Sequence, residues 1–352
     1  MNQDRRKVVP SDSALRRYTN FFTSLILMTL VYLKTGWNLF PNFEYMFALS
    51  ANFPDLPDID ALAQYNFYSL APYVVLSQLC FGAGNSTKLI FFIAIIFVLF
   101  CLQRVSNCNI NYRFSFVILL SSPALVILLS WIGSYDVVTV GMILVVLYTR
   151  KNSWALIAGI VAAWSNFEQF LLAGVILALA MNIENKSRSR RMMTAAISSC
   201  CAYVLLRFFL YSQGVSEIRA TGQMKLFENR DYFANALNSS PIVLLTIMSG
   251  SFVAIFYWVR VAKPTLKEVS RVGVGIFIIY ATAMIALDQT RIGAILILPL
   301  TLLLGEKIAS KCSPQQTQNF FRSSFLVALL TPPVFVWSYQ LHLVGWDNLL
   351  LR

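Results

Sequence analysis

Long apolar runs alternate with short polar segments along almost the whole chain, and this pattern predicts a bundle of membrane-spanning helices. About eleven runs are apolar enough to form part of such a bundle. They cover residues 21–33, 89–102, 114–131, 137–148, 154–164, 170–181, 193–211, 241–259, 272–287, 292–304 and 324–339. Once the apolar segment 65–81 is set apart, no connection is long enough for a soluble domain of about 50 residues. We therefore expect a single all-α, polytopic domain over residues 1–352.

Two connections are longer than the others, residues 34–87 and 212–240. Within the first, residues 65–81 are apolar, interrupted by Pro72 and polar on one side. This pattern predicts an amphipathic or re-entrant helix rather than a full span. A full span there would invert every later loop and abolish the charge asymmetry that orients the chain.

Composition and charge support a membrane protein and give its orientation. The chain is 57% hydrophobic and has a formal net charge of +12. Threading the spans from a cytoplasmic amino terminus places most of the 28 Lys and Arg on the cytoplasmic side. This positive-inside pattern makes residues 1–19 a cytoplasmic tail before a retained anchor, and it places both long loops outside. It also accounts for the basic charge without nucleic acid as a partner.

Several kinds of chemistry are poorly supported by the residues available. His342 is the sole histidine, so neither a His-based metal site nor a Ser-His-Asp triad is favoured. The six cysteines show no paired spacing in the outer loops, which predicts no disulfide. Small size and short loops favour a bacterial inner membrane, with the outer loops facing the periplasm or exterior.

Carboxylates gather at the outer ends of the predicted spans. The first outer loop combines them with tyrosines: Glu44, Asp55, Asp58, Asp60, Tyr65 and Tyr68. Three turns that join short spans carry one carboxylate each: Asp136, Glu168 and Asp288. An ionised carboxylate at membrane depth costs several kcal/mol unless it is paired or wetted. We therefore predict one acidic cavity that opens outward.

Cations on the same side are few, and they are candidates for binding a phosphate. A planar guanidinium matches phosphate oxygens, and Arg291 lies where a lipid-linked phosphate at headgroup depth could reach it. The second outer loop adds Arg219, Lys225 and Arg230.

Each of these features also has a structural interpretation. Asp288 and Arg291, at i and i+3, could neutralise each other, and Asp136 could cap a helix. Glu168 could pair with Arg207. The Asp58-Ile59-Asp60 sequence could be a solvated turn, and Tyr65 and Tyr68 could be membrane-interface residues.

The arrangement resembles the GT-C superfamily of polytopic glycosyltransferases, which use polyprenyl-phosphate-linked sugars. The resemblance lies in a cytoplasmic amino terminus, an acidic first outer loop with Asp55, Asp58 and Asp60, an amphipathic stretch after it, and about eleven spans. It implies a catalytic carboxylate in that loop. The family's acidic pair usually follows the first span closely, where this chain has Glu44, so both Glu44 and the Asp58/Asp60 pair are candidates.

The resemblance implies transfer of a sugar from the lipid-linked donor to a glycan or glycolipid acceptor on the non-cytoplasmic face. Asp58 or Asp60 would deprotonate the acceptor hydroxyl, while Arg291, Arg219 or Arg230 would stabilise the departing phosphate. The other acids would bind sugar hydroxyls, or a divalent cation such as Mg²⁺ or Mn²⁺ if one is used.

Two other classes of function stay open on the sequence. An O-antigen-type polymerase or ligase would use outer-loop arginines, for which Arg219 and Arg230 would serve, but such proteins usually place their long loop later in the chain. A transporter or lipid flippase would use intramembrane carboxylates as ion sites. The absence of an obvious repeat between the two halves disfavours a carrier.

Overall fold

The computed structural model describes residues 26, 29, 43–51, 53, 66–78, 117–119, 121–130, 134–180, 186–215, 230–286, 288–331, 334–337 and 340–343. Most of these residues are helical, as the apolar runs predict. The helices are α2 (Phe43–Ala51), α3 (Ala71–Gln78), α6 (Pro123–Ser130), α7 (Asp136–Tyr148), α8 (Asn152–Ala180), α9 (Lys186–Ser212), α11 (Arg230–Tyr257), the π-helix η2 (Trp258–Ala262), α12 (Leu266–Ile285), α13 (Gln289–Ala309) and α14 (Pro314–Leu330). One short hairpin, β1 (Val334–Trp337) and β2 (Gln340–Leu343), follows them.

Five helices in the described part of the chain are long and apolar enough to cross a membrane. They are α8, α9, the continuous segment of α11 and η2, α12 and α13. Helices α6 and α7 are shorter and fall within two more of the predicted runs. The runs at 21–33 and 89–102 lie outside the described residues, apart from helical positions 26 and 29. The fold is therefore compatible with an integral membrane protein.

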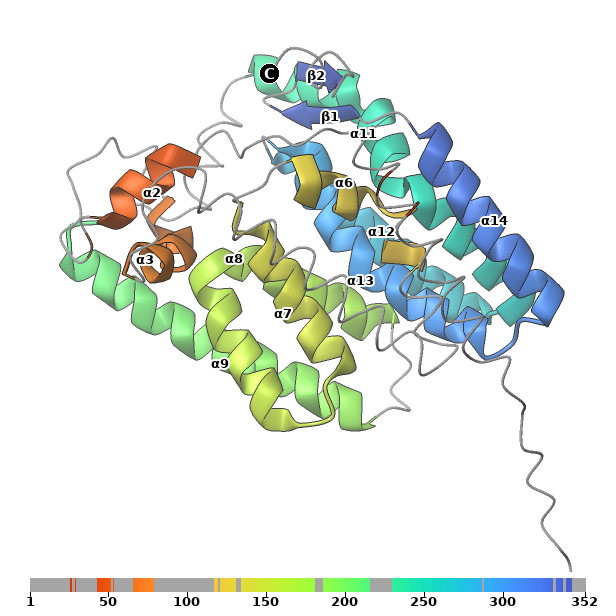
Figure 1. Cartoon of the computed structure of the whole chain (residues 1–352), viewed down its shortest axis with the longest axis horizontal. Helices are drawn as coiled ribbons and strands as arrows, with labels where there is room; N and C mark the ends of the chain where they lie inside the picture. The colour runs from red at the N-terminus through yellow and green to blue at the C-terminus, as the bar shows by residue number, and fades with distance from the viewer. Residues whose placement is uncertain are drawn as a thin grey trace, which may run out of the picture.

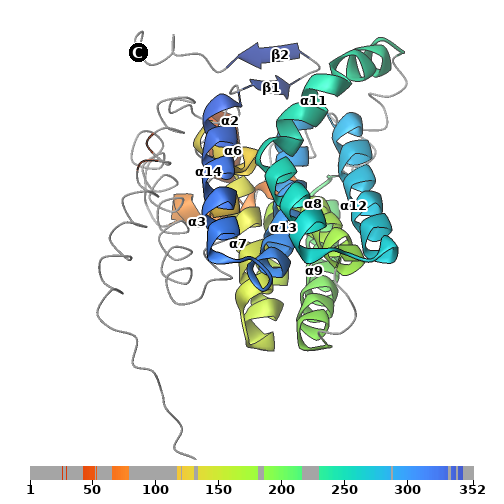
Figure 2. The same ribbon diagram turned by 90° about the vertical axis from the view of Figure 1, so that its right-hand side faces the viewer.

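Helix α13 occupies the centre of the bundle, between α8 on one side and α11 and α12 on the other (Figures 1 and 2). In its most apolar stretch, 89% of the residues are buried, which is the highest share among the five long helices. Apolar residues surround the whole helix rather than one face, and such a helix is stable only when other elements cover every side. Residues placed along α13 therefore lie inside the protein.

Helix α8 bends at Asn166, whose φ of −155° and ψ of 81° are not helical. The kink falls in the polar segment 165–169 that separates the predicted runs 154–164 and 170–181, so the structure joins these two runs into one kinked helix. Because the helical hydrogen-bond ladder is interrupted there, the polar side chains of this segment are turned into the bundle.

Helices α8 and α9 approach each other closely at Gly159. A Cβ atom at this position would collide with the Ala195 carbonyl oxygen and the Ser198 hydroxyl. Small residues at helix interfaces allow such close backbone approach in membranes. The pairing of these two long helices therefore depends on the missing side chain.

Replacing Gly159 with alanine is expected to destabilise the protein by about 1–3 kcal/mol, because the methyl group overpacks the interface. The same change at Gly141 on α7, where a Cβ has no neighbour within 4 Å, should stabilise by about 0.5–1 kcal/mol through helix propensity. Denaturant titration of the purified protein in detergent, followed by far-ultraviolet circular dichroism, measures both. Equal effects of the two changes would contradict the close approach.

The carboxy-terminal run differs from the prediction of a span over residues 324–339. Helix α14 ends at Leu330, and β1 pairs antiparallel with β2 from Val334 opposite Leu343 to Trp337 opposite Gln340. The sequence explains the break, because Thr331 is followed by Pro332 and Pro333. A proline lacks the amide donor of a helix and pushes the preceding residue out of the helical conformation.

Two loops predicted from charge are partly helical. The connection between the predicted runs 170–181 and 193–211 contains a basic cluster that begins at Lys186, and this cluster forms the first turns of α9. The second outer loop was expected to extend to residue 240, but α11 already begins at Arg230 and contains Pro241. Charged residues at the end of a long apolar helix do not stop it, since Lys and Arg are good helix formers.

Candidate functional site

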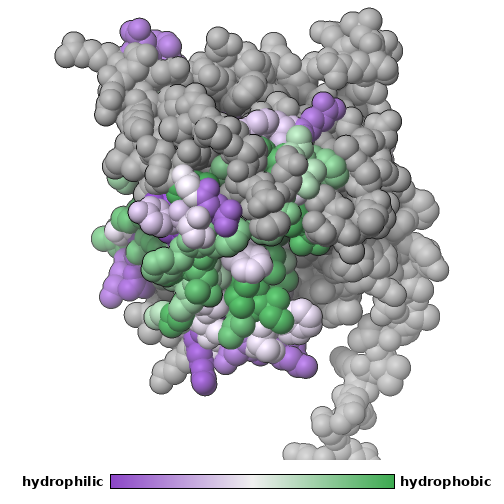
Figure 3. Space-filling model, turned by 90° about the vertical axis from the view of Figure 1, so that its left-hand side faces the viewer, coloured by the Kyte–Doolittle hydropathy of each residue, from purple (hydrophilic) through white to green (hydrophobic). Residues whose placement is uncertain are grey.

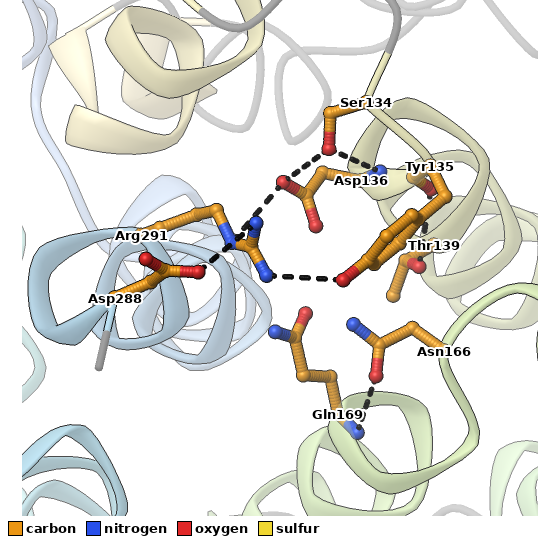
Figure 4. A network of polar contacts seen from close by, with 8 residues as sticks. All are labelled: Ser134, Tyr135, Asp136, Thr139, Asn166, Gln169, Asp288 and Arg291. Carbon is orange, nitrogen blue, oxygen red and sulfur yellow. Dashed lines mark hydrogen bonds and ion pairs between the residues drawn. The ribbon is translucent and has the colours of Figure 1, made fainter. Parts of the chain in front are cut away.

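A buried polar network joins the first turns of α7 and α13 (Figure 4). Arg291 lies at its centre and is 6% exposed. Its Nε atom lies 3.5 Å from Asp136 Oδ2, and its Nη1 atom lies 3.2 Å from Asp288 Oδ2. The guanidinium is therefore held between two carboxylates that the sequence placed at the ends of different spans.

Tyr135 and Ser134 fix the orientation of this ion-pair cluster. Arg291 Nη2 donates a hydrogen bond to the Tyr135 hydroxyl at 3.2 Å, and the guanidinium carbon lies 5.5 Å from the centre of the Tyr135 ring. The Ser134 hydroxyl donates to Asp136 Oδ2 at 2.7 Å. With contacts on several sides, the charged groups have little freedom to rearrange.

Both carboxylates lie at helix starts without capping them. Asp136 is the first residue of α7, and the capping position belongs to Tyr135. Asp288 holds the capping position of α13, but its side chain makes no capping hydrogen bond. The interpretation of Asp136 as a helix cap is therefore wrong. The positive ends of two helix dipoles nevertheless meet here, and they favour negative charge.

The kink of α8 adds two buried carboxamides, Asn166 and Gln169. They are 2% and 4% exposed, and the backbone N–H of Gln169 donates to Asn166 Oδ1 at 3.4 Å. Figure 4 shows both side chains pointing toward Arg291 and the Tyr135 hydroxyl. Within the described part of the chain, Gln169 Oε1 and Asp136 Oδ1 are buried without a hydrogen-bond partner. The network therefore contains two acceptors that need donors.

Tyr73 connects the predicted first loop, residues 34–87, to the network. Its side chain on α3 is fully buried, and burial raises the pKa of its hydroxyl well above the ordinary value. The neighbouring Tyr135 and Asp136 raise this pKa further, so the group stays a neutral hydroxyl. Helix α3 in turn packs against α2, which brings both described ends of the first loop to the same region.

An aromatic stack lies beside the same kink. Tyr68 is 2% exposed and accepts a hydrogen bond from Arg207. Its ring stacks on Tyr203 with centroids 5.7 Å apart, and Tyr203 stacks on Phe167 at 3.9 Å. Tyr68 thus lies inside the protein rather than at a lipid-facing interface, and it helps to fix the position of the kink.

The structure brings together three of the residues predicted from the sequence, Asp136, Asp288 and Arg291. Glu168 lies half-buried on the kink, Glu44 is exposed in the first turn of α2, and Arg230 is the first residue of α11. The remaining candidates lie outside the described residues: Asp55, Asp58, Asp60, Tyr65, Arg219 and Lys225.

Sequence reasoning missed five members of the network, although four of them carried a signal. Ser134, Tyr135, Asn166 and Gln169 lie in polar turns between apolar runs too short to cross a membrane, and such turns must be buried in protein or wetted. Tyr73 had no such signal, because it lies in a mostly apolar segment. Its position depends on how the first loop packs.

The network does not fit a divalent cation. Among the described residues, no group of three or more His, Cys, Asp or Glu is arranged to bind a metal ion. The two carboxylates that do converge share a guanidinium, which would repel Mg²⁺ or Mn²⁺ and occupies the oxygen atoms these ions prefer.

The fold and the network together describe a helical protein, compatible with an integral membrane location, whose central helix carries a buried arginine and two aspartates. Comparison with known protein families, curated proteins and solved structures finds no match.

Proposed function

We propose that this chain is a membrane glycosyltransferase that moves a sugar from a polyprenyl-phosphate donor to a glycan or glycolipid acceptor. The proposal includes a GT-C-like arrangement of about eleven spans in a bacterial inner membrane, with the active site on the periplasmic or exterior face. Its main support is the pair of buried acceptors, Asp136 Oδ1 and Gln169 Oε1, beside the guanidinium of Arg291. Sugar hydroxyls supply the donors that these atoms need, and a phosphate supplies oxygens for the arginine.

Asp288 is the carboxylate that the donor phosphate would displace from Arg291. Its side chain is 19% exposed, whereas the Asp136 side chain is 1% exposed and also accepts from Ser134. Asp136 would keep the guanidinium in place while the phosphate binds on the more open side. The starts of α7 and α13 would add favourable dipoles to the same anion.

The base would come from the first outer loop, as Asp58 or Asp60, with Asp55 and Glu44 as further carboxylates of that loop. The carboxylate takes the proton of the acceptor hydroxyl, and the hydroxyl oxygen forms a bond to the anomeric carbon. The bond between that carbon and the phosphate oxygen breaks, and the electron pair leaves with the polyprenyl phosphate. Arg291 stabilises the charge that develops on it.

A carrier is the second candidate, favoured by ion pairs at both ends of the central helix. At the end of α13 remote from Arg291, Glu306 pairs with Arg188 at 2.8 Å and Lys307 pairs with Glu268 at 3.1 Å. Charged clusters above and below a site can act as alternating gates. Reconstituted liposomes separate the two functions, because a carrier moves a lipid-linked sugar without transferring it.

Replacing Gln169 with leucine tests the proposed sugar contact, because leucine has a similar volume and lacks the amide. We expect KM for the polyprenyl-phosphate sugar to rise about tenfold through loss of one or two hydrogen bonds. The assay is transfer by purified protein, with a panel of polyprenyl-phosphate hexoses and pentoses as donors.

The matched control is Gln289→Leu, because Gln289 is also buried but accepts a hydrogen bond from Ser239 at 2.9 Å. The KM of this control variant should stay within about twofold of the KM of the unchanged chain. An unchanged KM in Gln169→Leu would remove the main support for a sugar site.

A further inference from the structure

The end of α13 remote from the candidate site carries a separate set of charged residues on α9. Glu306 follows Arg291 along α13 by about 22 Å at 1.5 Å per residue. Arg188 donates from both terminal nitrogens to Glu306, at 2.8 and 3.1 Å. The charge of Arg188 is therefore matched by a carboxylate on the central helix.

Arg191, one turn further along α9, has no such match. It is 8% exposed, its Nη1 atom donates to the Ser187 hydroxyl at 2.6 Å, and its Nε atom is buried without a hydrogen-bond partner. No carboxylate pairs with it in the part of the chain that the structure describes. A buried guanidinium without a counter-ion is costly, so this position favours an anion.

An apolar groove of about 30 Å³ lies between α7, α8 and α9 on the same side of the bundle. Its walls include Ile143, Val146, Phe170, Gly174, Met192 and Ala195. The hydrophobic surface on the left-hand side of the molecule is bordered at its lower edge by hydrophilic residues (Figure 3). The enclosed volume is about that of one water molecule, so a hydrocarbon chain would lie along the apolar lining rather than inside a closed cavity.

Helix geometry connects the groove to the arginines. Residues four apart share one face of a helix, so Arg191 lies directly before Ala195, and Arg188 lies before Met192. The α9 wall of the groove therefore continues into Arg188 and Arg191. Of these two, Arg191 is the one whose charge no described carboxylate matches.

We propose that Arg191 and this groove bind one anionic phospholipid, with its phosphate on the guanidinium and one acyl chain between α7, α8 and α9. The charge asymmetry of the sequence predicts that this end lies in the cytoplasmic leaflet, where anionic lipid headgroups attract basic residues. The site is separate from the one at Arg291, so its occupant is a structural or regulatory lipid and not the sugar donor.

The test is native mass spectrometry of the full chain in mild detergent, titrated with phosphatidylglycerol or phosphatidylcholine. We expect the unchanged protein to retain phosphatidylglycerol in preference, and Arg191→Gln to weaken its binding about tenfold through loss of a charge-assisted contact. Arg190→Gln removes the same charge from an exposed neighbour and should change binding by no more than about twofold.

A second variant tests the groove while keeping Arg191. A Cβ at Gly174 has no neighbour within 4 Å, so Gly174→Leu can fold with its side chain in the groove. It should weaken phosphatidylglycerol binding about tenfold, whereas Gly273→Leu, at an equally open position on α12, should not.

Three results would overturn the proposal. They are equal retention of the two phospholipids, unchanged binding in both Arg191→Gln and Gly174→Leu, and displacement of phosphatidylglycerol by added polyprenyl phosphate. The last result would assign the groove to the lipid carrier of the sugar donor. None of the three depends on whether the protein transfers a sugar.

Discussion

Replacing Arg291 with methionine is expected to destabilise the folded protein by about 3–5 kcal/mol, the usual cost of breaking a buried ion pair. The change would leave Asp136, which is fully buried, beside Asp288 without a positive charge between them. It would also remove the donor to the Tyr135 hydroxyl. Denaturant titration in detergent measures the loss, and an unfolding midpoint equal to that of the unchanged chain would contradict the network.

A triple variant separates the structural role of Arg291 from its proposed role in binding phosphate. Combining Arg291→Met with Asp136→Asn and Asp288→Asn removes the charges together, and replacement of a whole buried ion cluster is often neutral for stability. We expect the triple variant to recover most of the lost stability but no sugar transfer. Recovery of transfer would show that Arg291 only holds the helices together.

Apolar length and turn chemistry predicted much of the helical framework. The run 137–148 matches α7 to within one residue, because Ser134 and Asp136 mark its start and Arg150 follows its end. The prediction failed where local sequence interrupts an apolar run. The prolines after Thr331 turn the expected last span into a helix and a hairpin, although the run 324–339 is mostly apolar.

The candidate site was predictable in its charges but not in its neutral partners. A carboxylate or arginine in an apolar chain requires a partner, so Asp136, Asp288 and Arg291 could be grouped by the side of the membrane that they share. The contact between Tyr73 and this group depends on how α3 folds back onto the bundle. Packing of that kind leaves no periodic signal in a single sequence.

Replacing Asp58 and Asp60 together with asparagine is expected to lower kcat for sugar transfer by about 10²–10⁴-fold, the usual contribution of a general base. The physical reason is that Tyr73 on α3 lies beside Tyr135 and Asp136, and that α2 packs against α3. In the proposed mechanism, a carboxylate from the residues between these two helices meets an acceptor hydroxyl beside Arg291. The measurement is single-turnover transfer in detergent, with a polyprenyl-phosphate sugar in excess.

The same chemical change at Asp231, an exposed carboxylate in the first turn of α11, is the control, and it should leave kcat within about twofold. Stability should also be little changed in the Asp58/Asp60 variant, because asparagine keeps the size and shape of aspartate. Loss of kcat in Glu44→Gln alone would move the base to the exposed start of α2. Full transfer by the Asp58/Asp60 variant and by Glu44→Gln would instead remove the first loop from the chemistry, and the ion-paired ends of α13 would then favour the carrier.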